Sequence, residues 1–287
     1  MSDVRIRRLL LVGSVIVDIV LYVDALPERG GDVVASRSMT TAGGGFNVLS
    51  AAARQGLPSA YGGLVGSGPF GAQVRAALAT ESVELLLPEA GAQDTGFCVA
   101  LVEASGERTF ATTVGAEAGL TDELLASLPV REGDAVYVSG YDLVYPHAPA
   151  VARWIAALPP AVAVALDPGP LVADIPAEVL DPVMARLSWL SLNAREAELL
   201  AGAAARTSVA QVVFDRAPGL SGLILREGAR GCDLYRSADD VVHVGAFVAA
   251  LARAEDPVLA ARSANEAAAF SVTQRGPATA PHRTLPQ

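Results

Sequence analysis

The feature that most constrains the fold is the alternation of short apolar runs with Ala- and Leu-rich stretches along most of the chain. Continuous runs of Leu, Val and Ile indicate strands buried on both faces, and the stretches between them indicate covering helices. The expected strands are Leu9–Val17, Ala135–Ser139, Val162–Asp167, Leu187–Leu192 and Leu223–Leu225, and the expected helices are Val48–Gln55, Gln73–Thr80, Ala148–Ala157 and Arg195–Ala201. This order predicts an α/β fold whose central, mostly parallel sheet binds ligands outside the carboxyl ends of its strands.

Two segments interrupt this alternation. Asp18–Thr41 and Thr95–Val114 have the pattern of short β segments with turns, and Ser105-Gly106-Glu107 is a plausible hairpin turn in the second. A small β excursion of this kind either serves as a lid over a site or is a plain surface hairpin. Periodicity alone favours neither interpretation.

Composition narrows the class of protein. With 287 residues and 52% hydrophobic residues, the chain can bury one large core, and we expect a single α/β domain over residues 1–287. The net charge of −10 repels phosphate backbones and argues against a nucleic-acid partner. Cys98 and Cys232 lie far apart, which indicates a reduced, cytoplasmic protein without a disulfide framework. The three histidines are scattered and do not suggest a zinc site.

The N-terminus imitates a signal peptide, because three arginines precede the apolar run Leu9–Val12. Asp18 and Asp24 interrupt the apolar stretch, and no clear cleavage site follows. A buried first strand explains the run better. No segment has the length of apolar sequence that crossing a bilayer requires, so we expect no membrane association.

The sharpest local motif is the glycine run Gly43-Gly44-Gly45, followed by Phe46-Asn47. Consecutive glycines allow a backbone to approach a ligand closely and to adopt positive φ. Asn47 opens an Ala-rich helix, where its side chain can cap the helix or present its amide to a ligand. Taken alone, the motif is more simply a flexible turn before a capped helix.

The neighbouring motifs change that interpretation. They are, in chain order, Gly13-Ser14, Asp18, Gly30-Gly31-Asp32, Gly63-Leu64-Val65-Gly66, Asp94-Thr95-Gly96, Val138-Ser139-Gly140, Leu166-Asp167-Pro168, Asn193-Ala194-Arg195-Glu196 and Arg226-Glu227-Gly228-Ala229-Arg230-Gly231. Over essentially the whole chain, this ordered set resembles the PfkB (ribokinase-like) family of carbohydrate kinases. The resemblance implies a ribokinase-like fold with a β lid formed by about residues 18–41 and 95–114. It also implies ATP-dependent phosphorylation of a hydroxyl of a small sugar, by direct in-line transfer.

The resemblance implies a sugar side of the site. Asp18 and Asn47 would bind sugar hydroxyls, with the backbone of Gly43, Gly44 and Gly45 beside them. A carboxylate and an amide suit a polyol, since together they accept and donate hydrogen bonds. The alternative for Asp18 is a hydrogen-bonded residue at the end of a strand.

The resemblance also implies a nucleotide side, which would bind ATP and Mg²⁺. Asn193 and Glu196 would organise Mg²⁺ and its waters, because a hard cation takes oxygen ligands. Further residues implied on this side are Arg226, Gly228 and Gly231 near the ATP phosphates and ribose, and Asn265 with the Gly276–Pro277 turn near the adenine. The alternative for Asn193–Glu196 is a simple helix N-terminus with a favourable acid in its first turn.

The chain departs from the family where the catalytic base belongs. The family has a D-T-x-G-A-G-D loop there, whose glycine amides stabilise the transferred phosphoryl group and whose last Asp accepts the proton of the attacking hydroxyl. Here residues 239–247 read DDVVHVGAF, and without a gap the base position falls on Val241. Either the sequence lacks a segment that the whole protein has, which we favour, or the loop is deleted, or Asp240 or Asp239 replaces the base.

Further departures limit the substrate. Ribokinase has a Lys in its glycine motif where this chain has Gly44, and an Asn where it has Ile16. The strand end that carries a sugar-binding Glu in ribokinase reads Ser139-Gly140-Tyr141 here. These changes argue against ribose and leave a related sugar, a sugar phosphate or a nucleoside open. Two further expectations are a homodimer formed through the β lid and, as an alternative function, sugar or nucleotide binding without efficient phosphoryl transfer.

Overall fold

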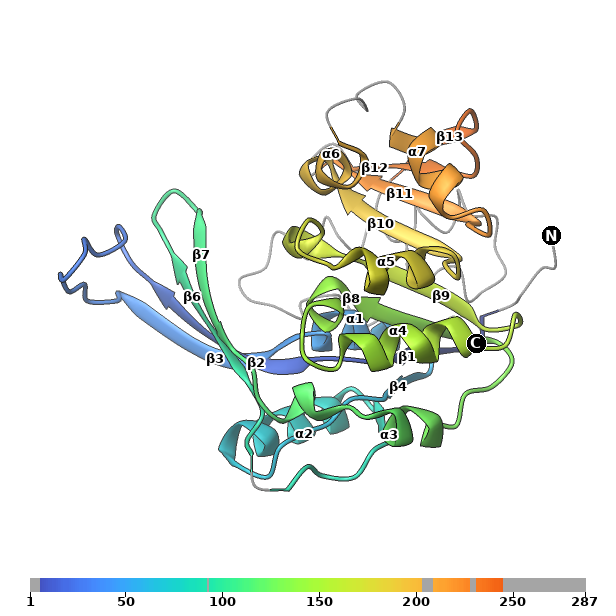
Figure 1. Ribbon diagram of the computed structural model, residues 1–287. Helices are drawn as coiled ribbons and strands as arrows, with labels where there is room; N and C mark the ends of the chain where they lie inside the picture. The colour runs from blue at the N-terminus through green and yellow to red at the C-terminus, as the bar shows by residue number, and fades with distance from the viewer. Residues whose placement is uncertain (1–5, 92, 203–208, 228–230, 245–287) are drawn as a thin grey trace, which may run out of the picture.

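The computed structural model describes residues 6–91, 93–202, 209–227 and 231–244 and contains two sheets in this part of the chain (Figure 1). The larger sheet has nine strands in the order β13-β12-β11-β10-β9-β8-β1-β4-β5. Its strands are β1 (Arg8–Leu11), β4 (Ser59–Tyr61), β5 (Glu84–Leu85), β8 (Asp134–Ser139), β9 (Ala163–Asp167), β10 (Trp189–Asn193), β11 (Gly222–Arg226), β12 (Cys232–Tyr235) and β13 (Val241–Val244). All neighbours from β5 to β11 pair in parallel, and β12 and β13 pair antiparallel.

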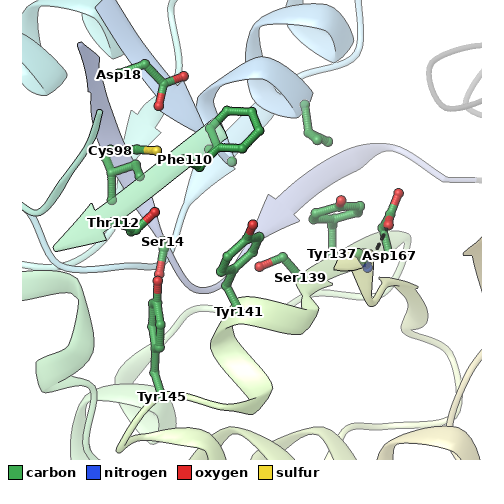
Figure 2. Close-up of a pocket in the computed structure, with 15 residues that line it drawn as sticks. Ser14, Asp18, Cys98, Phe110, Thr112, Tyr137, Ser139, Tyr141, Tyr145 and Asp167 are labelled. Carbon is green, nitrogen blue, oxygen red and sulfur yellow. Dashed lines mark hydrogen bonds between the residues drawn. The ribbon is translucent and has the colours of Figure 1, made fainter. Parts of the chain in front are cut away.

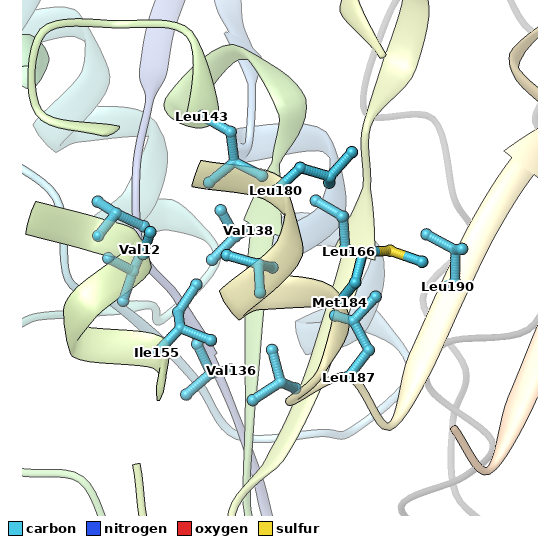
Figure 3. Packing of buried hydrophobic residues seen from close by; sticks show 14 of the residues in the cluster. Val12, Val136, Val138, Leu143, Ile155, Leu166, Leu180, Met184, Leu187 and Leu190 are labelled. Carbon is cyan, nitrogen blue, oxygen red and sulfur yellow. The ribbon is translucent and has the colours of Figure 1, made fainter. Parts of the chain in front are cut away.

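Helices cover both faces of this sheet, because its central strands are buried on both sides. On one face, Leu10, Val136 and Leu166 pack against α3 (Asp122–Ser127), α4 (Ala148–Ala157), α5 (Ala177–Met184), α6 (Ala194–Ala201) and α7 (Val209–Arg216) (Figure 3). On the other face, Leu9 and Leu11 pack against α1 (Phe46–Arg54) and α2 (Pro69–Thr80). Neighbouring residues of β1 thus enter different cores, as the period of a strand requires.

The smaller sheet projects from the body and has the order β3-β2-β6-β7 (Figure 1). It is formed by β2 (Val15–Tyr22), β3 (Arg37–Gly44), β6 (Phe97–Val102) and β7 (Arg108–Thr113). The hairpin between β6 and β7 turns at Gly106, whose φ is +89°, and the amide of Glu103 donates to the carbonyl of Glu107. The two segments that interrupt the α/β alternation therefore do form β structure, and they pair with each other in one sheet.

Each of the five predicted strands overlaps a strand of the large sheet, but the sequence analysis did not predict β4, β5, β12 or β13, and one predicted strand is wrong in extent. The apolar run Leu9–Val17 is not a single strand, because the chain breaks at Gly13, whose φ of +132° is incompatible with a continuous strand. β1 therefore belongs to the large sheet and β2 to the small one. Continuous hydrophobicity hides such a break, because both strands are apolar.

The four predicted helices are confirmed, with α2 beginning four residues before the prediction, at Pro69. Within the described residues, no helix is long and apolar enough to span a membrane.

Candidate active site

The parallel strands bring polar residues from distant parts of the sequence to one edge of the large sheet. β8, β9, β10 and β11 end at Ser139, Asp167, Asn193 and Arg226, and Ser14 follows the end of β1. Because these strands are adjacent and parallel, their carboxyl ends lie side by side in the order β11-β10-β9-β8-β1. This is the edge at which open α/β sheets bind their ligands.

A cavity of about 280 Å³ lies between this edge and the small sheet (Figure 2). The small sheet contributes Asp18, Cys98, Phe110 and Thr112 to one wall, and Tyr141 and Tyr145 lie across from them. The complete lining is Ser14, Ile16, Asp18, Gly44, Gly45, Val48, Cys98, Phe110, Thr112, Tyr137, Ser139, Tyr141, Tyr145, Asp167 and Gly169. A few polar groups on a mostly apolar and aromatic wall are typical of a small-molecule site.

Asp18 projects from β2 into this cavity. Its carboxylate has no hydrogen-bond partner among the described residues, and burial raises its pKa from 3.8 to about 6. The alternative of a hydrogen-bonded strand-end residue is therefore wrong. A half-buried carboxylate without a partner in the part of the chain that the structure describes is available to a donor on a ligand.

The glycine run fits against Asp18 and Ser14. A Cβ on Gly43 would lie 1.9 Å from Oδ2 of Asp18, and a Cβ on Gly45 would lie 2.8 Å from the carbonyl oxygen of Ser14. Gly44 has a φ of +59°, the left-handed region. The run is therefore needed for close approach between β3 and β2, beyond any role in a turn. Gly44 and Gly45 line the cavity, and Gly43 lies behind Asp18.

Asn47 lies in the first turn of α1 but does not cap it, because the N-cap residue is Gly45. Its side-chain Oδ1 is buried without a hydrogen-bond partner among the described residues. Asn47 is not part of the cavity lining, although the adjacent Val48 is. An enclosed, unsatisfied amide oxygen beside a cavity marks a place where a ligand or water completes the hydrogen bonding.

Sequence reasoning missed the polar floor of the cavity. Ser14 and Ser139 line it, and both donate hydrogen bonds of 2.6 Å to the buried carboxylate of Asp142. Ser14 and Asp142 are 128 residues apart, so the pairing follows from the topology alone. The available signals were the motifs Gly13-Ser14 and Val138-Ser139-Gly140, which lie at strand ends where ligand-binding residues gather but which were given no role.

The nucleotide-side residues form a closed network. Asn193 caps α6, accepting from the amide of Glu196 at 2.8 Å, while the carboxylate of Glu196 accepts from the amide of Asn193 at 2.7 Å. Arg226 bridges two carboxylates, with Nη1 2.6 Å from Oδ2 of Asp167 and Nη2 3.0 Å from Oε2 of Glu196. Burial raises the pKa of Asp167, while the charge of Arg226 acts against that rise.

This network does not fit direct coordination of Mg²⁺. Among the described residues, no group of three or more acidic, His or Cys side chains is placed to hold a metal ion. Both oxygens of Glu196 accept hydrogen bonds from Asn193, and Arg226 supplies the positive charge at this point. The geometry matches the alternative interpretation of Asn193–Glu196 as a capped helix N-terminus.

Asp240 cannot replace the missing base. β12 runs antiparallel to β11, so that Cys232 pairs with Arg226 at the site edge and Tyr235 pairs with Leu223. Asp240 follows Tyr235 in the turn before β13, and its amide donates to Ser237. It therefore lies at the opposite edge of the sheet, about 10 Å or more from the ends of the strands. The ungapped placement of the base at Val241 is wrong for the same reason, since Val241 begins β13 beside Tyr235.

Gly228, Asn265 and the Gly276–Pro277 turn lie outside the described residues. Gly231 is described, with a φ of +93°, and its carbonyl accepts from the amide of Glu227 directly before β12.

Comparison with known proteins supports the fold. The family model of the pfkB family carbohydrate kinases matches residues 7–244, and the chain belongs to this family. The uncharacterized sugar kinase YegV of Escherichia coli (strain K12) is 34% identical over 196 residues, 68% of this chain and 60% of that protein.

Solved structures show the same fold. The ribokinase of Giardia lamblia superposes with a TM-score of 0.80 at 18% identity, covering 96% of this chain and 97% of that one. The Arabidopsis thaliana ribokinase complexed with ribose and ATP superposes with a TM-score of 0.71 at 20% identity, covering 96% of each chain. The chain spans 60% and 62% of the lengths of the two curated relatives that it matches, YegV and the ribokinase of Arabidopsis thaliana.

Proposed function

We propose that this protein is an ATP-dependent kinase that phosphorylates a hydroxyl of a small sugar or sugar-like molecule bound in the cavity beside Asp18. The observation that carries the proposal is the unsatisfied carboxylate of Asp18 in a cavity at the carboxyl ends of the parallel strands. Membership of the pfkB family supports the reaction class. The small sheet, which contributes Phe110 and Thr112 to the cavity, would act as a lid.

Within the described residues, the chain supplies substrate binding. The Asp18 carboxylate accepts a hydrogen bond from a substrate hydroxyl, and the small sheet limits the access of water to the cavity. ATP would approach from the side of β10 and β11, where Arg226 is partly exposed. We assign no step to Mg²⁺, because no acidic cluster of the described residues is placed to coordinate it directly, and no proton acceptor, because Asp240 lies at the opposite edge of the sheet.

Two observations favour a second function. The sequence contains no G-A-G-D, and Asp240 lies at the opposite edge of the sheet. A chain without the base and its glycine amides would bind sugar but transfer phosphate slowly, since a base contributes about 10²–10⁴ in rate. This alternative is a sugar-binding protein on a kinase scaffold.

The test pairs a coupled ADP-release assay, across pentoses, hexoses and nucleosides, with the intact mass of the purified protein. Sugar-dependent ADP release supports the kinase. Sugar binding without ADP release, at the 29.4 kDa mass of these 287 residues, supports the binding protein. A larger mass together with turnover would mean that the whole protein has a segment that this sequence lacks. The homodimer formed through the small sheet, and the cytoplasmic location, remain predictions.

A further inference from the structure

The cavity is lined by acidic side chains but by no cationic side chain among the described residues. Among the described residues that line it, the charged side chains are Asp18 and Asp167, and no Lys, Arg or His is present. Asp167 is already paired with Arg226, which leaves Asp18 as the unpaired charge. Proteins recognise phosphate and carboxylate groups with Arg, Lys or clustered amides. A negatively charged substrate would therefore enter this cavity without a cationic side chain to balance its charge.

The two serines on the floor of the cavity, Ser14 and Ser139, add further hydrogen-bond acceptors. A serine hydroxyl has one proton, and an ionised carboxylate can only accept hydrogen bonds. The Ser14 hydroxyl donates to Oδ1 of Asp142 and the Ser139 hydroxyl donates to Oδ2, and each of these two hydrogen bonds is 2.6 Å long. Each hydroxyl therefore has only lone pairs left for a molecule in the cavity.

The position of Asp142 is fixed by its surroundings. Its side chain is buried, with 1% of the residue exposed. The backbone of Gly13 passes so close that a Cβ there would lie 2.1 Å from Oδ2 of Asp142. His147, also buried, places Nε2 3.6 Å from Oδ1. Asp142 cannot turn toward the cavity itself, so it acts on a ligand through the two serines.

We infer that Asp142 is a positioning residue that holds the hydroxyl protons of Ser14 and Ser139, so that this subsite selects an uncharged polyol whose hydroxyls donate to the two serines. The inference rests on the proposed function, since it takes the cavity as the site of the phosphate acceptor. Of the substrates that the sequence leaves open, free sugars and nucleosides fit, and sugar phosphates do not.

The first experiment compares matched pairs of probes by titration calorimetry at pH 7.5 without nucleotide: D-ribose with D-ribose 5-phosphate, and D-fructose with D-fructose 6-phosphate. We expect a free sugar to bind at least tenfold more tightly than its phosphate ester. A phosphate ester that binds as tightly as its parent sugar, or more tightly, overturns the inference and leaves the proposed kinase intact. If no probe binds and none supports ADP release, the inference and the proposed function both fail.

The second experiment tests the direction of the hydrogen bonds, with the tightest-binding free sugar and its monodeoxyfluoro analogues. Fluorine cannot donate a hydrogen bond. The analogue with fluorine in place of the hydroxyl that contacts the serines should therefore bind about tenfold more weakly than the sugar, which corresponds to the loss of one hydrogen bond. In Asp142→Asn the amide donates to one serine, which can then turn its own proton to the ligand. The preference for hydroxyl over fluorine should fall severalfold in this variant.

Two further variants separate positioning from stability. Asp134→Asn changes another buried aspartate, at the far end of β8, where it pairs with Arg8 at 2.7 Å. It should lower stability and leave the hydroxyl-to-fluorine preference unchanged. Ser139→Ala keeps Asp142 in place and should remove part of that preference even if Asp142→Asn does not fold. An equal preference in the wild type, Asp142→Asn and Ser139→Ala would overturn the role of Asp142.

Discussion

The sugar side and the nucleotide side of the site edge differ in whether the predicted ligand-binding residues have hydrogen-bond partners within the described part of the chain. On the sugar side, the carboxylate of Asp18 and the Oδ1 of Asn47 have no partner among the described residues. On the nucleotide side, Asp167 and Glu196 are joined through Arg226. Leaving a buried polar group unsatisfied costs about 1–3 kcal/mol, whereas a closed network of pairs avoids that cost. The difference indicates that the sugar side is built to receive a ligand, while the nucleotide side must exchange existing contacts for new ones.

The largest expected effect is on the sugar side. Asp18→Asn removes the charged acceptor and should weaken sugar binding about 100-fold, the equivalent of one or two hydrogen bonds to a charged group. The change is measured by calorimetry with the tightest-binding sugar. Asp24→Asn, an exposed residue beyond the end of the same strand, is the matched control and should bind normally. Unchanged affinity in Asp18→Asn would remove Asp18 from the site.

The pH dependence follows from the pKa of Asp18, about 6 in the folded chain and 3.8 as its ordinary value. Sugar binding needs the carboxylate, so affinity should fall about tenfold per unit as the pH drops below 6. Asp18→Asn should show no such slope. A flat profile for the wild type between pH 5 and 7 would contradict this role.

Sugar affinity should rise with pH, whereas the contribution of Asp18 to folding stability should fall with pH. The folded chain holds the proton of Asp18 more tightly than the unfolded chain, so the stability associated with protonated Asp18 is lost as the pH rises from about 4 through 6. At pH 7, without sugar, Asp18→Asn should therefore melt at a higher temperature than the wild type. The difference should shrink as the pH is lowered toward 4.

On the nucleotide side, removing Arg226 should lower the free energy of unfolding more than it changes sugar affinity. Arg226→Ala leaves Asp167 and the buried Glu196 facing each other, and should cost about 2 kcal/mol in urea unfolding at pH 7. Sugar affinity should change by less than about threefold, because Arg226 does not line the cavity. Arg153→Ala is the control, since its ion pair with Asp122 is exposed and such pairs contribute about 0–1 kcal/mol. Loss of sugar binding in Arg226→Ala would show that the two sides are not independent.

The smallest effect is expected at Asp240, far from both sides of the edge. Asp240→Asn should change neither sugar affinity nor any ADP release by more than about twofold. Loss of turnover in this variant would restore Asp240 as a base and contradict the strand register of β11 and β12.

The sequence predicts the fold, and it draws attention to Asp18 and the glycine run beside the cavity, because these signals are local. Buried parallel strands are recognisable as apolar runs, and Asp18 and Gly43 lie within short motifs of recognisable order. The floor of the cavity was not predictable in this way, since Ser14, Ser139 and Asp142 meet only when β1 and β8 pair. The break at Gly13 was hidden because its φ leaves no trace in hydrophobicity.

On the nucleotide side, the sequence could not decide between two roles for Asn193 and Glu196. Asn193–Glu196 is consistent with a metal site and with a capping box, and the choice depends on Arg226, which comes from a different strand. The placement of the base failed because no local signal shows that the chain reverses direction in β12 and β13.

The most direct test of this account is titration of the wild-type chain with free sugars in the absence of ATP and Mg²⁺, at pH 7.5. The account predicts saturable binding of at least one uncharged sugar, because the sugar side holds unsatisfied acceptors before any nucleotide is present. Sugar binding that appears only after ATP has bound would contradict it.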